Sequence, residues 1–202
     1  MFEIPKTEKA LKSKISYYRS ALNKEKRDFG YISDGHGKRY ILFWLLFILN
    51  NSKKSENYFK WYQSEFPNDS GEPLQTLCWS LGLLRLQKEE ESIFRLAEAM
   101  LSNLYMIPHI IQEEIHLHDI WHSSNVEEFG YLNYIPKGII ENISQREMVW
   151  IKEQYNSLTF RRIKKRYIEI FHELQFLKEV KDRKKLLSES RSLLDWLNPA
   201  FG

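Results

Sequence analysis

The chain has 202 residues, enough for one domain with its own core, and 43% of them are hydrophobic, which excludes intrinsic disorder. The formal net charge of +3 is too small by itself to indicate a polyanionic partner. A single cysteine, Cys78, excludes an internal disulfide and suits a reducing compartment. Only 8 Gly and 6 Pro interrupt the chain, so we predict an all-α fold and one helical domain over residues 1–202.

The sequence also bears on where the protein resides. The first residues lack the apolar core of a signal peptide. The longest nearly apolar run, Tyr40 to Leu49, is about half the length of a membrane span. We therefore expect a soluble, cytoplasmic protein without a membrane partner.

The N-terminal region, residues 5–37, is predicted to be one helix followed by a loop. Pro5 suits the first turn of a helix that runs to residue 27. Apolar side chains recur in steps of three and four, at Leu11, Ile15, Tyr18 and Leu22. Three glycines, the last of them Gly37, then mark a loop between helices.

Residues 38–108 are predicted to form two antiparallel helical hairpins. The first pairs a helix over 38–50, apolar on nearly all sides and therefore buried, with a helix over 53–66. Pro67 closes this hairpin. The second hairpin pairs helices over 74–87 and 92–106 and ends at Pro108.

A shift of 37 residues lays the second hairpin over the first, with Phe43 on Ser80, Ser55 on Ser92 and Phe59 on Leu96. Residues 39–108 resemble the tetratricopeptide repeat in three respects: this spacing, the Trp79-Ser80 pair of a large and a small residue, and the closing prolines. The resemblance implies a concave groove, lined by the first helix of each hairpin, that binds peptides. The groove residues would be Tyr40, Trp44, Phe47, Leu77, Leu81 and Leu84.

That groove would be too apolar to remain open to water as one large patch. The amphipathic N-terminal helix and the basic C-terminal helices are the obvious internal segments to fill it. We therefore expect the two hairpins to form the buried core. Any interaction site would then lie on outer faces or at a dimer interface.

Residues 109–143 are predicted to contain short helices and loops, beginning with a helix over 109–122. On a helix, Glu114, His118 and His122 would share one face, and two histidines with a carboxylate can bind zinc or iron. The simpler interpretation is a solvated face of mixed charge. Ser124, with Glu127 three residues later, predicts a capping box for a short helix through residue 133.

Residues 144–202 form the basic C-terminal region, with 13 Lys/Arg against 8 Asp/Glu after residue 144. Ser144 and Glu147 predict a capping box at its start. One straight helix from there to Leu197 would be about 80 Å long, more than a compact domain accommodates. We therefore predict breaks near residues 156–157 and 180–182.

One stretch of this region concentrates positive charge. Five bases occur within six residues, namely Arg161, Arg162, Lys164, Lys165 and Arg166. Such a stretch can contact phosphates or an acidic protein. However, Glu169 and Glu173 follow at helical spacing and can neutralise it internally.

The sequence thus indicates a non-enzymatic helical scaffold or adaptor that contacts another protein or a second copy of itself, as in a homodimer. No serine lies in a nucleophile elbow, and Cys78 has the surroundings of an inert buried thiol. No cofactor is indicated. Two alternatives remain open, a metal-binding helical enzyme or sensor using residues 109–122, and a nucleic-acid-associated protein using residues 161–166.

Overall fold

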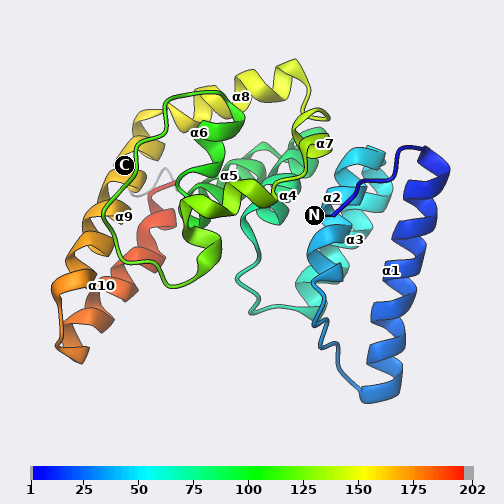
Figure 1. Ribbon diagram of the computed structural model, residues 1–202, viewed down its shortest axis with the longest axis horizontal. Helices are drawn as coiled ribbons and strands as arrows, with labels where there is room; N and C mark the ends of the chain where they lie inside the picture. The colour runs from blue at the N-terminus through cyan, green and yellow to red at the C-terminus, as the bar shows by residue number, and fades with distance from the viewer. Residues whose placement is uncertain (1, 198–202) are drawn as a thin grey trace. The chain divides into compact units, whose positions relative to one another are not determined.

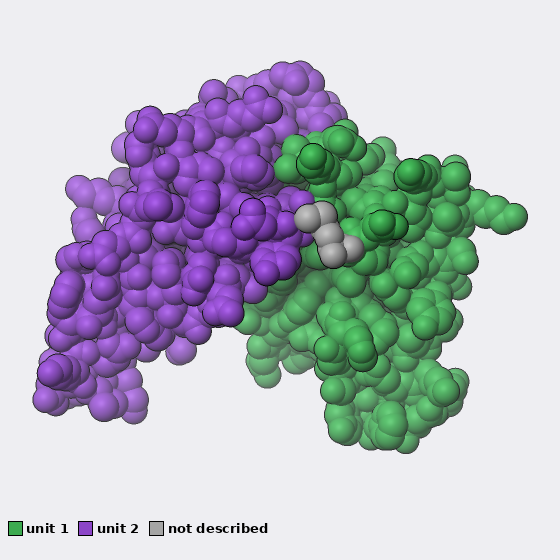
Figure 2. Space-filling model, in the orientation of Figure 1, with its two compact units in different colours: residues 1–92, 136–142 green, residues 93–135, 143–202 purple. Residues whose placement is uncertain are grey.

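The computed structural model describes residues 2–197, and the regular secondary structure within this range is entirely helical (Figure 1). The predicted all-α class is therefore confirmed. Residues 1 and 198–202, the ends of the predicted N- and C-terminal regions, lie outside the described range. The chain divides into two compact units, coloured separately in Figure 2. Unit 1 comprises residues 1–92 and 136–142, and unit 2 comprises residues 93–135 and 143–202.

Unit 1 is built from helix pairs that follow one another along the chain. Its helices are α1 (Glu8–Phe29), α2 (Lys38–Leu49), α3 (Ser52–Glu65), α4 (Pro73–Arg85), the first turn of α5 (Glu89–Ser102), and α7 (Lys137–Ile140). Helix α2 packs against α1, α3 and α4. Helix α1 therefore covers part of the apolar surface of α2.

Local signals set the ends of these helices. The predicted start of α1 at Pro5 is wrong, because the Thr7 hydroxyl accepts a hydrogen bond from the Ala10 N–H and makes Thr7 the N-cap. Gly30 ends α1 in the left-handed conformation, with φ of 79°. At α2, the buried Asp34 carboxylate accepts hydrogen bonds from the backbone N–H groups of Lys38 and Arg39, each at 2.8 Å.

Aromatic rings form the centre of unit 1. The Phe43 ring lies 5.4 Å from the Phe59 ring, nearly parallel to it, and 5.2 Å from the Trp79 ring. Helices α3 and α4 approach closely because Gly82 has no side chain. A Cβ atom at this position would lie 2.6 Å from Cζ of Phe59. The absence of a side chain at Gly82 thus lets the Phe59 ring pack directly against α4.

Unit 2 is arranged around one long helix, α9. Its elements are the rest of α5, α6 (Met106–Ile110), the 3₁₀ helices η1 (Asn125–Glu127) and η2 (Phe129–Tyr134), α8 (Gln145–Tyr155), α9 (Leu158–Phe176), α10 (Val180–Ser192) and the 3₁₀ helix η3 (Leu193–Leu197). Helix α9 packs against α8, α10 and η3. Its buried face consists of Phe160, Ile163, Ile170, Phe171 and Leu174.

The predicted break near residues 156–157 is confirmed, whereas the second break precedes the predicted residues 180–182, which lie in the first turn of α10. Helix α8 begins with the predicted capping box of Ser144 and Glu147. It ends at Tyr155, and Ser157 caps α9 by accepting a hydrogen bond from the Phe160 N–H. The second break lies between Phe176 and Val180.

The predicted helix over residues 109–122 is wrong. Helix α6 ends at Ile110, and Gln112 has a φ of 57°, which turns the chain away from the helix axis. Residues 113–122 contain no helix and run as an irregular, extended stretch. A longer helix would need an apolar residue at position 118 or 119 to continue the stripe from Ile111 and Ile115, and these positions are His118 and Asp119.

The short helix predicted after Ser124 is replaced by the 3₁₀ helices η1 and η2. The Ser124 hydroxyl does accept a hydrogen bond from the Val126 N–H, so it acts as the N-cap. The Glu127 side chain reaches back to the Ser123 N–H, at 2.8 Å, and the predicted capping box is therefore shifted by one residue. No helix within residues 2–197 has the length and hydropathy to cross a bilayer.

Candidate functional site

The candidate site of unit 2 is formed by residues 113–122, here called the extended segment, and by the side of α9 next to it. The Trp121 N–H donates to the Phe171 carbonyl at 3.0 Å, and the Gln175 side chain donates to the Asp119 carbonyl at 2.8 Å. Two depressions flank the segment, and His118 lines both. On α9 they are bordered by residues spaced three or four apart, namely Arg161, Lys164, Ile168 and His172.

The first depression has a volume of about 370 Å³ and combines basic, aromatic and polar side chains. It is lined by Leu104, Pro108, Glu113, Glu114, Ile115, His116, His118, Tyr155, Asn156, Arg161 and Lys164. The Lys164 ammonium donates to the Tyr155 hydroxyl at 2.8 Å. Burial, followed by the nearby Arg161 charge, lowers the pKa of Lys164, although Glu113 opposes this shift.

The two cations of this depression, Arg161 and Lys164, form no ion pair with its two carboxylates, Glu113 and Glu114. Within residues 2–197, Lys164 has only the neutral Tyr155 hydroxyl as a hydrogen-bond partner, and the Arg161 guanidinium forms no ion pair. Glu113 is already bound to Lys152 at 3.3 Å and to the Asn156 amide at 3.0 Å. A carboxylate entering from outside would therefore find two cations available.

His118 separates the two depressions. Its ring stacks on the Tyr105 ring with centroids 6.1 Å apart, and its backbone N–H donates to the Tyr105 hydroxyl at 3.4 Å. Burial and the neighbouring Lys164 and His116 charges lower the pKa of His118. The lowered pKa favours the neutral imidazole, in which one ring nitrogen donates a hydrogen bond and the other accepts one.

The second depression has a volume of about 390 Å³ and a partly apolar lining. It is lined by Leu117, His118, Asp119, Ile168, Glu169, His172 and Glu173. Leu117 keeps 70% of its surface exposed, as does Phe176 with 68% at the end of α9. Exposed large apolar side chains beside a hollow are typical of a contact surface.

The backbone of the extended segment is largely unpaired. Within the described residues, the N–H groups of Glu114, Ile115, His116 and Leu117 form no hydrogen bond with the rest of the protein. An all-helical protein normally satisfies its backbone groups within helices. Because neighbouring N–H groups of an extended chain point to opposite sides, alternate donors of this exposed stretch resemble an unpaired strand edge.

The three metal candidates do not converge. Glu114 is exposed and lies 3.9 Å from the His116 ring, while His118 is stacked on Tyr105. His122 instead faces Glu127, 3.9 Å away. Among residues 2–197 no group of three His, Cys, Asp or Glu side chains is placed to hold a metal ion. The extended backbone removes the common helix face on which that hypothesis was based.

The five bases of the predicted basic run lie on different sides of α9. Arg161 and Lys164 border the first depression, and Lys165 is exposed, 4.0 Å from Glu169. On the other side, the Arg162 guanidinium lies over the Trp196 ring at 5.7 Å. Arg166 binds both carboxylate oxygens of Glu189, at 2.6 and 2.9 Å. The run is thus no single basic face.

Sequence reasoning missed Tyr155 and the unpaired backbone of residues 114–117. Nothing in the sequence indicates that the Lys164 ammonium would lie beside the Tyr155 hydroxyl, because the two residues belong to different helices. A signal for the extended backbone did exist, since residues 113–119 have no continuous helical stripe.

Comparisons with protein-family models, with curated proteins and with solved structures found no match to this chain.

Proposed function

We propose that this chain is a non-enzymatic helical scaffold that binds an extended segment of another protein along residues 113–122. The observation that carries the proposal is the run of four free N–H groups, Glu114 to Leu117, on an exposed stretch of chain. An extended peptide can add to such an edge through main-chain hydrogen bonds, while pockets on either side select its side chains.

The two depressions indicate the chemistry of the partner. Lys164 and Arg161 favour an acidic side chain in the first depression, where Lys164 is half-buried and lacks a counter-ion within the described residues. Leu117 and Ile168 favour an apolar side chain in the second. The expected partner segment is therefore extended and carries one acidic and one apolar side chain.

A tetratricopeptide-like relationship between the hairpins α2–α3 and α4–α5 is part of the same proposal. It is supported by reciprocal hydrogen bonds between Ser80 and Ser92, in which each hydroxyl donates to the other's carbonyl at 2.8 Å. Both serines are fully buried, and small residues let two helices of a hairpin approach closely. Ser55 is also buried, at the equivalent position of the first hairpin.

The two alternatives have less support. A metal-dependent enzyme or sensor would need Glu114, His118 and His122 to converge, and their surroundings differ. A nucleic-acid surface would need the basic run to present one face, whereas Arg166 is bound to Glu189.

The proposal is tested by affinity purification of the full chain from its native host, followed by mass spectrometry. Proline removes one backbone donor and is compatible with an extended chain. We would therefore compare His116→Pro with His116→Ala, and Leu117→Pro with Leu117→Ala. Two neighbouring positions are needed because neighbouring donors of an extended chain point to opposite sides, and only one of them would face the partner. At least one proline variant should lose most of the partner, and its alanine counterpart should retain more.

A helical content that matches wild type in circular dichroism would show that the proline variants remain folded. If no protein co-purifies reproducibly, or if both proline variants recover the partner like their alanine counterparts, the proposed binding edge is wrong. Light scattering provides a further outcome. A stable dimer that the proline substitutions dissociate would replace the external partner by a second copy of the chain.

A further inference from the structure

Unit 1 contains a cavity of its own, on the surface between α1 and α3 and far in sequence from the extended segment. Its volume is about 260 Å³, and it is lined by Lys12, Ile15, Ser16, Arg19, Leu46, Lys54, Asn57 and Tyr58. The α1 residues and the α3 residues each recur at helical spacing, so each helix contributes one face. Ile15, Leu46 and Tyr58 supply apolar surface. None of the lining residues is acidic.

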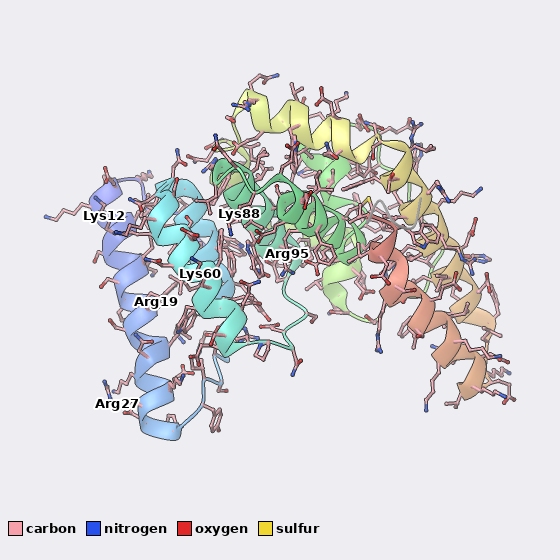
Figure 3. All side chains as sticks on the ribbon, turned by 180° about the vertical axis from the view of Figure 1, so that it is seen from behind. Lys12, Arg19, Arg27, Lys60, Lys88 and Arg95 are labelled. Carbon is pink, nitrogen blue, oxygen red and sulfur yellow. The ribbon has the colours of Figure 1, made fainter. Side chains whose placement is uncertain are left out.

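Arg19 is the unusual member of this cavity. Its guanidinium lies 4.0 Å from the centroid of the Trp61 ring and 5.3 Å from that of Tyr58, and Figure 3 shows it between α1 and α3. Its Nη1 atom is buried, yet it has no hydrogen-bond partner within residues 2–197. Unpaired buried donors are unfavourable, and those of a charged group especially so. The stacked guanidinium is thus held in place with its hydrogen-bonding capacity unused.

The charges around the cavity are only partly compensated. At one end, Lys12 forms an ion pair with Glu8 at 2.5 Å. At the other end, Glu65 lies near Arg19 but binds the Lys26 ammonium, at 2.6 and 2.7 Å. Lys54 has no ion-pair partner among the described residues. Lys12 and, less strongly, the nearby charge of Lys54 lower the pKa of Glu8, but neither Arg19 nor Lys54 forms an ion pair within residues 2–197. Two cations without an ion pair thus border a cavity with an apolar wall.

We propose that this cavity binds a small phosphate monoester that carries an apolar group. A phosphate monoester has a charge of about −1.5 to −2 at pH 7, which suits the two cations that form no ion pair. A guanidinium whose plane is fixed by a ring can present its N–H groups to phosphate oxygens in a fork. Ser16 and Asn57 offer further hydrogen bonds, and Ile15, Leu46 and Tyr58 can contact the apolar group.

The test is isothermal titration calorimetry of the full chain at low salt with four probes: phenyl phosphate, inorganic phosphate, benzoate and phenol. Phenyl phosphate should bind most tightly, because it alone combines the dianion with an apolar ring. Arg19→Met keeps a long apolar side chain on Trp61, and Lys54→Gln keeps the length of an exposed side chain. Each should weaken phenyl phosphate binding about tenfold or more, since charge-assisted hydrogen bonds are worth roughly that factor.

Lys24→Gln is the matched control, because Lys24 lies exposed on α1 outside the cavity and its loss also removes one positive charge. It should leave the affinity for phenyl phosphate within about twofold of wild type. Three results would overturn the proposal: the absence of saturable heat with phenyl phosphate, equal affinity for phenol, or equal losses in Lys24→Gln and Lys54→Gln. Because Lys54→Gln alters only an exposed side chain, the test does not depend on whether Arg19→Met folds.

Discussion

The two units use helices in different ways. In unit 1 the buried polar groups at the helix ends are bound internally, as Asp34 shows by capping α2 and accepting a hydrogen bond from Arg39, while Phe43 packs within a cluster of rings. In unit 2 a ten-residue stretch next to α9 leaves four N–H groups free. The difference indicates that unit 1 is specified mainly by its core. Unit 2 gives up helical structure in the stretch where the proposed function places a partner.

The largest expected effect tests whether the two units are separately cooperative. Phe43→Ala removes a ring that is 1% exposed, and such truncations cost about 3–5 kcal/mol of unfolding free energy. Hydrogen exchange should show lost protection in α2, α3 and α4, with α8 and α9 retained. Phe160→Ala, at an equally buried position of unit 2, should give the reverse pattern. Loss of protection throughout the chain in both variants would show that the units unfold as one.

A smaller effect on the unfolding free energy should depend on pH and arise at Glu72. This residue is the N-cap of α4, and its side chain accepts a hydrogen bond from the Gln75 N–H. Burial raises the pKa of Glu72 to about 7. A raised pKa means that the folded state holds this proton more tightly than the unfolded state. The stabilisation is therefore complete below the unfolded pKa, near 4.5, and is lost as the pH rises through about 7.

Glu72→Gln removes this titration while keeping a side-chain acceptor for the helix end. Urea unfolding should show the variant and wild type about equally stable near pH 4.5. At pH 8 the variant should be the more stable by about 1–2 kcal/mol, less than the whole pKa shift implies because Glu72 is partly exposed. A constant difference at all pH values would mean that Glu72 does not titrate in this range.

The sequence predicted much of this fold because its signals are local. Prolines, caps and apolar stripes predicted α2, α3 and α4, and the Ser144–Glu147 capping box predicted the start of α8. Each of these signals operates within a few residues, so no knowledge of distant contacts is needed.

The candidate sites were less predictable because they depend on contacts between distant residues. Lys164 was recognised only as one base in a run, and its partner Tyr155 belongs to another helix. Similarly, the helical spacing of Arg19 gives no sign that its guanidinium would stack on Trp61 of α3. The extended segment was predicted as a helix because its His and Glu residues also fit a solvated helix face.

Unit 2 offers a side-chain cap at the C-terminus of a helix, which can be compared with the backbone cap that Gly30 provides at the end of α1 in unit 1. Arg183 of α10 donates hydrogen bonds to the carbonyls of Leu174 and Leu177 at the end of α9, and its guanidinium lies 5.3 Å from the centroid of the Trp121 ring. Arg183→Gln should lower the unfolding free energy by about 1–2 kcal/mol. Arg183→Lys should recover only part of it, because an ammonium lacks the planar fork. Equal stability of all three proteins in urea would contradict this role.

The smallest expected effect concerns the side of α9 that faces away from the extended segment. The hydrogen bond from Arg166 lowers the pKa of Glu189. The pair therefore stabilises the fold at pH values above the pKa that Glu189 has in the unfolded chain. This stabilisation is lost as the pH falls through the lowered pKa of the folded state. The two side chains are 29% and 38% exposed, so solvent screens the pair, and Glu189→Gln should cost less than about 1 kcal/mol and less still at high salt.

The same substitution also tests whether the basic run of residues 161–166 is neutralised internally or is available to bind a polyanion. Glu189→Gln removes the bidentate partner of Arg166, which keeps only Glu169 and Glu173 nearby, and raises the net charge by one. It should therefore strengthen retention on immobilised heparin. Glu179→Gln, also an acid of unit 2 but without a partner among the described residues, is the matched control and should raise retention less. If the two variants elute together, general net charge explains heparin binding. If wild type already binds heparin at physiological salt as strongly as Glu189→Gln, the ion pair does not neutralise the run, and the nucleic-acid alternative gains support over the scaffold.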